Sequence, residues 1–314
     1  MRIVVLDSVV INKEQKERLE TIGNLEIFDG LPRDNEEIIK RGKDADIIIL
    51  GWTNITKDVL SRLPNLKMIS LWATGYDYVD IEEAKKRGII VTNVPGYAKN
   101  AVAELAVSLM LSVSRKIPGA DIDVRKSGEY NWDKFKGREL TEKTLGIIGL
   151  GAIGFKVAQI AKGFDMKIIA YDPFPKEDLA KEYGIEYVDF ERIFTETDII
   201  TIHMPLLPAT ENIISHREIS LMKNSTIFIN TARAKLVDQE ALYEALASKE
   251  IYGAGLDDID MTSESGSKIL DLDNVVLTPH MGFYTEEAIT TKTDICIDNV
   301  MNYVNLQPTN IVNI

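Results

Sequence analysis

The sequence is poor in cysteine and in long apolar runs. Its only cysteine, Cys296, cannot form a disulfide within the chain, and the start MRIVVLDSVV lacks the basic and long apolar segments of a secretory signal. The most apolar window, from Ala101 to Val113, contains Glu104 and is shorter than the roughly 20 residues that span a bilayer. We therefore expect a cytoplasmic protein in which this window is a buried helix.

Basic side chains are also in deficit, since 36 Lys and Arg stand against 49 Asp and Glu, a formal net charge of -13. Such a chain repels nucleic-acid phosphates and anionic lipids, so we expect neither nucleic acid nor a membrane as a partner. No motif described below suggests a metal site. The 314 residues contain enough apolar material for two medium-sized cores.

Short β-rich runs alternate with charged helical stretches almost from end to end, which is typical of βα units on parallel sheets. The first series occupies about 95 residues and ends at the turn NVPGY. After a helix that begins near Asn100, a second series starts at TLGIIGLGAIG and supplies six or seven strands. The last segment, 285–307, is expected to be one helix with an apolar stripe, able to pack on the first domain. The fold class expected is α/β with two doubly wound parallel sheets.

The stretch GLGAIG places Gly149, Gly151 and Gly154 between an expected strand and an expected helix. In that context the first glycine allows a tight turn, and the second lets a pyrophosphate approach the backbone. The third lets the helix pack closely on the strand. The spacing therefore predicts a dinucleotide-binding turn.

The residues around this turn point to the cofactor. Ala152 and Ile153 begin the helix, whose N-terminal amides and dipole favour an anion. Asp172 ends the next strand, 23 residues after Gly149, where it can accept hydrogen bonds from ribose hydroxyls and would repel a 2′-phosphate. We expect NAD rather than NADP.

Other stretches complete a larger pattern. In chain order they are NVPGYAKNAVAE, YDPF, HMP, NTARAKLVD, GLD and TPHMGFYTEE. In order and spacing they resemble the D-isomer-specific 2-hydroxyacid dehydrogenase family over essentially the whole chain. The resemblance implies a flavodoxin-like substrate domain, residues 1–96 with 286–314, into which a Rossmann NAD domain, 97–285, is inserted. It also implies a homodimer formed largely by the helix after Asn100. Because the chain ends soon after its last helix, we expect no C-terminal regulatory domain.

The resemblance implies that Arg233 binds the substrate's carboxylate and keto oxygen and that His280 is the general acid/base. The chemistry also requires such groups, because hydride addition to a keto carbon creates an alkoxide that needs a proton donor and a fixed positive charge. Arginine suits the second task because its rigid fork keeps its charge. The family has glycine where this chain has Ala234, and the extra methyl could adjust the Arg233 backbone or narrow the site.

Further contacts are implied by the same resemblance. The loop Ala73, Thr74 and Gly75 would offer amides to the substrate carboxylate. Apart from the resemblance, Trp52 follows an expected strand and, with other aromatic residues, could line a substrate pocket or simply pack. The remaining cofactor contacts would be His203, Pro205, Thr231 and Asp257. His216 is expected at the surface.

The sequence departs from the family in the stretch GLDDIDMTSESG. The family usually has a glutamate five residues after the residue equivalent to Asp257, and this glutamate orients and charges the catalytic histidine. Thr262 stands at that position here. Glu264 is the leading substitute and a candidate catalytic residue, and Asp260 is a weaker one. The absence of any carboxylate partner is equally open, and Asp258 is interpreted as a solvated loop residue.

Two functions are compatible with these residues. The first is NADH-dependent reduction of a 2-keto acid to a D-2-hydroxy acid, with glyoxylate, pyruvate, hydroxypyruvate, a branched keto acid or phosphohydroxypyruvate as possible substrates. The second is a non-catalytic NAD-responsive binding protein, which the missing glutamate favours slightly. The retention of Arg233 and His280 argues more strongly for the enzyme, because a sensor has no chemical need for them.

Overall fold

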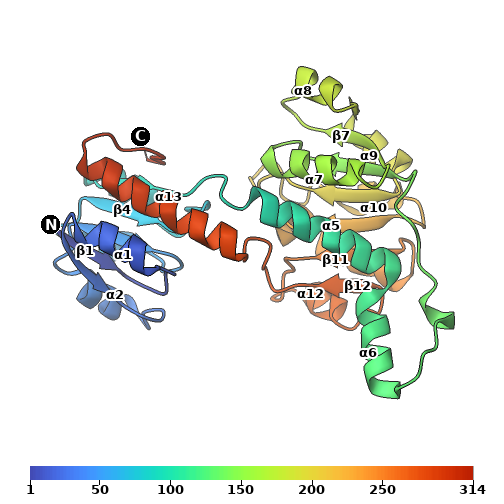
Figure 1. Cartoon of the computed structure of the whole chain (residues 1–314), viewed down its shortest axis with the longest axis horizontal. Helices are drawn as coiled ribbons and strands as arrows, with labels where there is room; N and C mark the ends of the chain where they lie inside the picture. The colour runs from blue at the N-terminus through green and yellow to red at the C-terminus, as the bar shows by residue number, and fades with distance from the viewer. Residues whose placement is uncertain (314) are drawn as a thin grey trace. The chain divides into compact units, whose positions relative to one another are not determined.

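The computed structural model describes residues 1–313, which divide into two compact units (Figure 1). Unit 1 is Met1–Ala98 together with the chain from Tyr284 onward, and unit 2 is Lys99–Phe283. The divisions expected from the sequence, after residues 96 and 285, each lie two residues from these. Unit 1 is therefore discontinuous in sequence, and unit 2 is one continuous segment.

Unit 1 is built on a five-stranded parallel sheet with the strand order β2-β1-β3-β4-β5. Every residue of β3 and β4 is buried, because helices cover both faces of the sheet and leave no polar side to the strands. The strands are β1 (Arg2–Val5), β2 (Asn24–Ile27), β3 (Ile47–Leu50), β4 (Met68–Leu71) and β5 (Ile90–Thr92).

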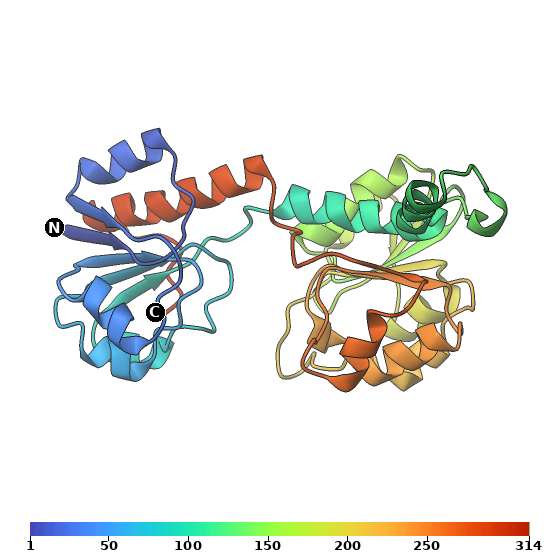
Figure 2. The ribbon, with the colours of Figure 1, turned by 90° about the horizontal axis from the view of Figure 1, so that it is seen from below.

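The helices of unit 1 form two layers, which Figure 2 shows above and below the sheet. One layer contains α1 and the last helix, α13, whose buried Cys296, Ile297 and Val300 join the core against β4. The apolar stripe and the packing on the first domain are thus confirmed. The helices are α1 (Lys13–Glu20) and α13 (Glu286–Val304) on one face, and α2 (Asn35–Gly42), α3 (Lys57–Ser61) and α4 (Ile81–Lys86) on the other.

Unit 2 is built on a seven-stranded parallel sheet with the order β12-β11-β10-β9-β6-β7-β8. The order reverses direction between β6 and β9, as in doubly wound nucleotide-binding sheets. The expected fold class, α/β with two doubly wound parallel sheets, is confirmed. The strands are β6 (Thr144–Ile148), β7 (Lys167–Tyr171), β8 (Ile185–Tyr187), β9 (Ile199–Ile202), β10 (Ile227–Asn230), β11 (Gly253–Leu256) and β12 (Val275–Leu277).

Two layers of helices cover this sheet as well. α5 and α7 lie on one face, and α9 to α12 lie on the other (Figure 2). The helix expected near Asn100 stops at Lys116, whose φ of 53° breaks the hydrogen-bond ladder before α6 begins with Pro118 near its start. The helices are α5 (Lys99–Arg115), α6 (Ile117–Ser127), α7 (Ala152–Lys162), α8 (Glu177–Glu182), α9 (Phe190–Glu196), α10 (His216–Ser220), α11 (Gln239–Ala247) and α12 (Glu264–Ile269), with 3-10 turns η1 (Asp133–Phe135) and η2 (Ala234–Leu236).

The apolar window 101–113 lies within α5 and packs its buried side chains on α7 and on strands β10 to β12. Within residues 1–313, no helix combines the length and the apolar character needed to cross a bilayer.

Candidate active site

The candidate residues of unit 2 gather at one edge of its sheet. Because all seven strands are parallel, their carboxyl ends meet at the same edge, which is where open α/β sheets bind ligands. The loops that leave this edge begin at Gly149 after β6, Asp172 after β7, His203 after β9, Thr231 after β10, Asp257 after β11 and Thr278 after β12.

The three glycines of the turn after β6 each meet a different steric demand. Gly149 has a φ of 91°, and a Cβ there would lie 2.8 Å from the carbonyl oxygen of His203. A Cβ on Gly154 would collide with the carbonyl oxygen of Gly149, so α7 could not pack this closely on β6. A Cβ on Gly151 would meet open space, which leaves room for a ligand beside the backbone.

The start of α7 can accept an anion. Gly151 is its N-cap, and no side chain of the described residues caps the helix. The amides of the first turn, including those of Ala152 and Ile153, therefore depend on water or a ligand for hydrogen bonds.

Asp172 is fixed to this turn rather than left loose at the strand end. Its Oδ2 accepts a hydrogen bond from the Leu150 amide and its Oδ1 accepts one from the Phe174 amide, each at 2.8 Å. A carboxylate has about four acceptor positions, so two remain for ribose hydroxyls.

His203 is held as a neutral imidazole. Its Nε2 lies 2.9 Å from the Thr201 hydroxyl, and burial of the ring lowers the pKa of His203 to about 3. A ring that stays neutral at physiological pH cannot serve as the cationic proton donor. It can still lie against the nicotinamide ring of a bound cofactor. Pro205, two residues on, is exposed.

The Thr231 hydroxyl is buried and has no hydrogen-bond partner among the described residues. Leaving a buried polar atom unsatisfied costs about 1–3 kcal/mol, so such an atom calls for a ligand or water. Together with the open space at Gly151 and the uncapped start of α7, it fits a bound dinucleotide. Such a cofactor would be held by this turn, by Asp172 and by Thr231.

Arg233 extends from a turn that a buried side chain fixes. Asn230, at the end of β10, accepts a hydrogen bond from the Ala232 amide and donates one to the Arg233 carbonyl, each at 2.9 Å. The guanidinium of Arg233 donates to the Ala232 carbonyl at 2.8 Å, and the residue is exposed. Ala234 is 5% exposed, so the methyl that replaces the family's glycine points into the unit. Sequence reasoning missed Asn230, although an asparagine at a strand end, three residues before the arginine, was a visible signal.

His280 lies in a turn that is closed by the neighbouring loop. Its φ is 54°, and its amide donates to the Asp257 carbonyl at 2.9 Å. The Asp257 carboxylate is 3% exposed and accepts hydrogen bonds from the Thr278 hydroxyl at 2.5 Å, the Met281 amide at 2.9 Å and the Gly282 amide at 2.8 Å. Most of its acceptor capacity thus holds this turn, whereas the family resemblance implied only a contact with the cofactor.

Asp258 is not the solvated residue that the sequence suggested. Its Oδ1 lies 3.5 Å from Nδ1 of His280, and its Oδ2 accepts a hydrogen bond from the Ala234 amide at 2.8 Å. Burial alone would raise the pKa of the Asp258 carboxyl. The hydrogen bonds from His280 and Ala234, with the nearby charges of His280 and Arg233, outweigh that effect and hold the pKa below its ordinary value. The interpretation of Asp258 as a solvated loop residue was therefore wrong.

The two carboxylates proposed from the sequence as partners of the histidine are engaged elsewhere. Glu264 is the first residue of α12, is exposed, and forms an ion pair of 2.6 Å with Lys268, one turn along the helix. Asp260 accepts hydrogen bonds from the amide and the hydroxyl of Thr262, at 3.0 and 2.5 Å. Because helix α12 begins right after this turn, the chain carries Glu264 into the helix instead of the active-site loop.

In unit 1, the proposed carboxylate loop follows β4. The Thr74 hydroxyl donates to the Val94 carbonyl at 2.7 Å, and the Val94 amide donates to the Ala73 carbonyl at 2.8 Å. Thr74 is exposed and Gly75 is partly exposed. These bonds fix the loop against the segment after β5 while leaving part of it accessible.

Trp52 lies in a loop that is fixed from beneath by a buried carboxylate. Asp7 is fully buried after β1 and accepts hydrogen bonds from the amides of Gly51, Trp52 and Thr53 and from the Thr53 hydroxyl, at 2.6 to 2.9 Å. The indole of Trp52 is nevertheless 52% exposed. The loop is rigid at its backbone and presents an aromatic ring.

Lys292 is the unexpected feature of unit 1. It is 1% exposed, and its ammonium lies 3.6 Å from the ring centre of Trp72, 5.2 Å from that of Tyr97 and 5.4 Å from that of Trp52. Trp72 is itself buried and donates from Nε1 to the Thr293 hydroxyl at 2.9 Å, so this tryptophan packs within unit 1. Ring faces stabilise a cation, but burial lowers the pKa of Lys292 to about 8.

That shift predicts how stability depends on pH. Between about pH 8 and 10 the unfolded chain still protonates Lys292 while the folded chain does not, so the free energy of unfolding should rise with pH. Urea unfolding at pH 8 and at pH 9.5 should show wild-type stability rising by roughly 1–2 kcal/mol more than that of Lys292→Met. Equal changes in the two proteins would show that the folded and unfolded chains bind this proton equally well.

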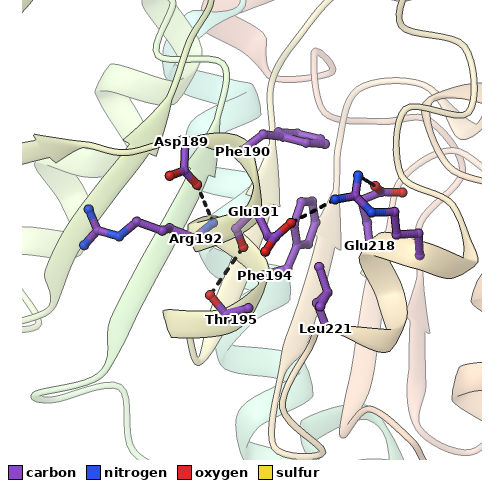
Figure 3. Close-up of a pocket in the computed structure, with 9 residues that line it drawn as sticks. Asp189, Phe190, Glu191, Arg192, Phe194, Thr195, Glu218 and Leu221 are labelled. Carbon is purple, nitrogen blue, oxygen red and sulfur yellow. Dashed lines mark hydrogen bonds and ion pairs between the residues drawn. The ribbon is translucent and has the colours of Figure 1, made fainter.

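The pocket drawn in Figure 3 lies apart from these residues. It is lined by α9 and α10, with Phe190, Phe194 and Leu221 contributing apolar surface. Arg217 also lines it and is paired with Glu191 at 2.8 Å. None of the candidate residues above lines it, and its charges already have partners, so we assign it no function.

The family model described as D-isomer specific 2-hydroxyacid dehydrogenase, NAD binding domain, matches residues 107–282. Hydroxypyruvate reductase of Thermotoga maritima is 43% identical over 81% of this chain and 83% of its own length. D-3-phosphoglycerate dehydrogenase of Methanocaldococcus jannaschii is 41% identical over 92% of this chain, but the match spans only 54% of that relative. The structure of an acyclic imino acid reductase in complex with NADPH and D-Arg has a TM-score of 0.88 and 36% identity, covering 99% of this chain and 100% of the other.

The matched segment exceeds half of the chain and contains the whole carboxyl edge described above. The protein is thus an oxidoreductase, an NAD(P)-dependent 2-keto acid reductase or 2-hydroxyacid dehydrogenase. This result favours the enzyme over a non-catalytic NAD-responsive protein. The chain belongs to the D-isomer-specific 2-hydroxyacid dehydrogenase family.

Proposed function

We propose that this protein uses NADH to reduce a 2-keto acid to the corresponding D-2-hydroxy acid. In this proposal unit 2 binds the cofactor and unit 1 is the substrate domain. Arg233 binds the carboxylate and keto oxygen of the substrate, and His280 donates the proton.

The observation that carries the proposal is the placement of Arg233 and His280. Both are exposed, and they follow β10 and β12, the two strands that flank β11 at the same edge of the sheet. Neither side chain is buried by packing within unit 2. A cation and a proton donor that are held by ordered turns but face solvent suit a small anionic ligand.

The residues divide the chemistry between them. The bound cofactor would supply the hydride to the keto carbon. The guanidinium of Arg233 would neutralise charge on the keto oxygen as it becomes an alkoxide, and its fork would fix the adjacent carboxylate. His280 would transfer its proton to that oxygen, so that keto acid, NADH and one proton give the hydroxy acid and NAD.

The choice of NAD is proposed from Asp172. Asp172→Asn should lower the ratio of kcat/KM with NADH to kcat/KM with NADPH by about 10- to 100-fold, because the carboxylate would no longer repel a 2′-phosphate. Initial rates with both cofactors at one keto acid concentration would measure this. Asp29→Asn, an exposed aspartate of unit 1, is the control and should leave the ratio unchanged. A wild-type enzyme that prefers NADPH would contradict the assignment.

The substrate class can be tested directly by following NADH oxidation with small, branched, aromatic and phosphorylated 2-keto acids. One further assay condition is needed because one of the structural neighbours is an imino acid reductase. Each keto acid should therefore be assayed with and without added ammonia, which forms the 2-imino acid in solution. Turnover without ammonia supports the proposal, and turnover that depends on ammonia would replace it with imine reduction.

A homodimer is proposed from the family resemblance and from exposed apolar residues. α5 itself is largely occupied by packing within unit 2, whereas α6 has no buried residue and extends away from the sheet (Figure 1). Tyr130 and Trp132, just after it, are 92% and 81% exposed. The partner surface is therefore proposed to centre on α6 and the following segment, and sedimentation velocity would measure the oligomeric state.

A further inference from the structure

We propose that Asp258 is the carboxylate that positions His280 and stabilises its protonated form, and that it also holds the turn that carries Arg233. The role that the family gives to a glutamate at the position of Thr262 would thus be filled by a residue four positions earlier. This inference rests on the proposed function of Arg233 and His280 and names a positioning residue for it.

The topology places Asp258 between the two groups. It follows β11, which lies between β10 and β12 in the sheet, so its loop has the Arg233 turn on one side and the His280 turn on the other. Each oxygen serves one side, since Oδ2 accepts the Ala234 amide at 2.8 Å and Oδ1 lies 3.5 Å from Nδ1 of His280. One side chain therefore links the two turns.

The other carboxylates of the stretch from Gly255 to Gly266 do not compete for this role. Asp257 is directed at the Thr278 hydroxyl and at two backbone amides of its turn. Asp260 accepts from Thr262, and Glu264 is paired with Lys268 in solvent. Within this stretch only Asp258 forms an ion pair with His280.

The backbone conformation of His280 shows that the turn presenting its ring is held in one defined form. A histidine at φ 54° is in the left-handed region, which costs roughly 1–2 kcal/mol for a residue with a Cβ. The turn is kept in this form by the amide of His280 and by the buried Asp257. With Nδ1 directed at Asp258, Nε2 is the nitrogen left to donate a proton to the substrate.

Charge explains why the loss of the glutamate is tolerable. Arg233 and a protonated His280 are both cationic, and Asp258 is the carboxylate that both influence. Because their effects keep the pKa of Asp258 low, its negative charge persists across the working pH range. An ionised carboxylate beside Nδ1 stabilises the imidazolium and fixes the ring orientation, which is what the reduction requires.

The first test is the pH dependence of kcat/KM for keto-acid reduction. Reduction needs the protonated imidazole, so activity is lost as pH rises. Asp258→Asn keeps the size of the side chain and removes its charge, so the alkaline midpoint should move to lower pH and kcat should fall by about 10- to 100-fold. Asp258→Glu retains the charge and should restore part of the midpoint shift.

Glu264→Gln is the matched control and should reproduce the wild-type profile, because Glu264 is exposed and paired with Lys268. NADH affinity, measured by fluorescence, should be unchanged in all three variants. Superimposable profiles of Asp258→Asn and wild type would overturn the proposal, as would a shifted midpoint in Glu264→Gln.

A second measurement separates this proposal from the proposed activity. The chain has only three histidines, so the ring resonances of His280 can be identified by NMR with His203→Gln and His216→Gln variants. The titration midpoint of His280 should be lower in Asp258→Asn than in wild type, whether or not any keto acid is turned over. An unchanged midpoint would reject the pairing even in an active enzyme, and a lowered midpoint in an inactive protein would retain the pairing and reject the reaction.

Discussion

Replacing Arg233 by alanine should lower kcat/KM for a 2-keto acid by about a thousandfold or more while NADH affinity stays within about threefold of wild type. The guanidinium is the only cationic fork proposed for the carboxylate and keto oxygen, and its loss removes both contacts. Among residues 1–313 it donates only to the adjacent Ala232 carbonyl, and it is exposed, so its removal should leave the fold intact. Steady-state kinetics and NADH fluorescence titration would measure the two effects.

Arg233→Lys is the informative companion to this variant. Lysine keeps the positive charge but not the planar pair of donors, so an intermediate loss of about a hundredfold is expected. If Arg233→Ala retained wild-type turnover, the assignment of this residue to the substrate would be wrong. If both variants lost NADH binding, Arg233 would instead belong to the cofactor site.

Replacing His280 by asparagine should lower kcat for reduction by roughly a thousandfold and remove the loss of activity at alkaline pH. Asparagine is chosen because the backbone at this position has a φ of 54°, which asparagine tolerates better than alanine does. The loss would then report on the missing proton donor and not on a disturbed turn. Rates measured from acidic to mildly alkaline pH would test this.

His216→Asn serves as the control for this second prediction. His216 is exposed at the start of α10 and its Nδ1 lies 3.8 Å from Glu244, so its replacement should change neither rate nor profile. A pH profile that persists in His280→Asn would mean that another group titrates. His203 could not be that group, because burial holds its pKa near 3.

The sequence predicts best what depends on short, periodic patterns. The two series of alternating strands and helices, the turn at Gly149 and the placement of Arg233 and His280 at strand ends all follow from apolar runs and from the parallel topology they imply. The two additional contacts that fix those turns, from Asn230 and Asp258, depend on side chains that reach neighbouring loops. The spacing of residues along the chain does not show which side chains contact a neighbouring loop.

The burial of Lys292 is a second feature that the sequence did not predict. Its spacing from Ile289 and Cys296 puts it on the apolar face of α13, yet lysine is normally expected to be exposed. Only the folded unit shows that three aromatic rings meet at that face and surround the ammonium. Glu264 was misplaced because a helix start at residue 264 removes it from the loop, and helix boundaries are the least predictable feature of a sequence.

The discontinuity of unit 1 has a consequence for the order in which the protein matures on the ribosome. Unit 2 is continuous and can fold once residue 283 has left the exit tunnel, whereas the face of the first sheet that α1 and α13 cover together stays partly uncovered until α13 has been synthesised. The core of this face is completed only when Ile297 and Val300 of α13 pack against Ile3, Ile47 and Met68 of the sheet. These strands are thus translated before the helix that completes their core, and in that interval their apolar side chains stay exposed to solvent.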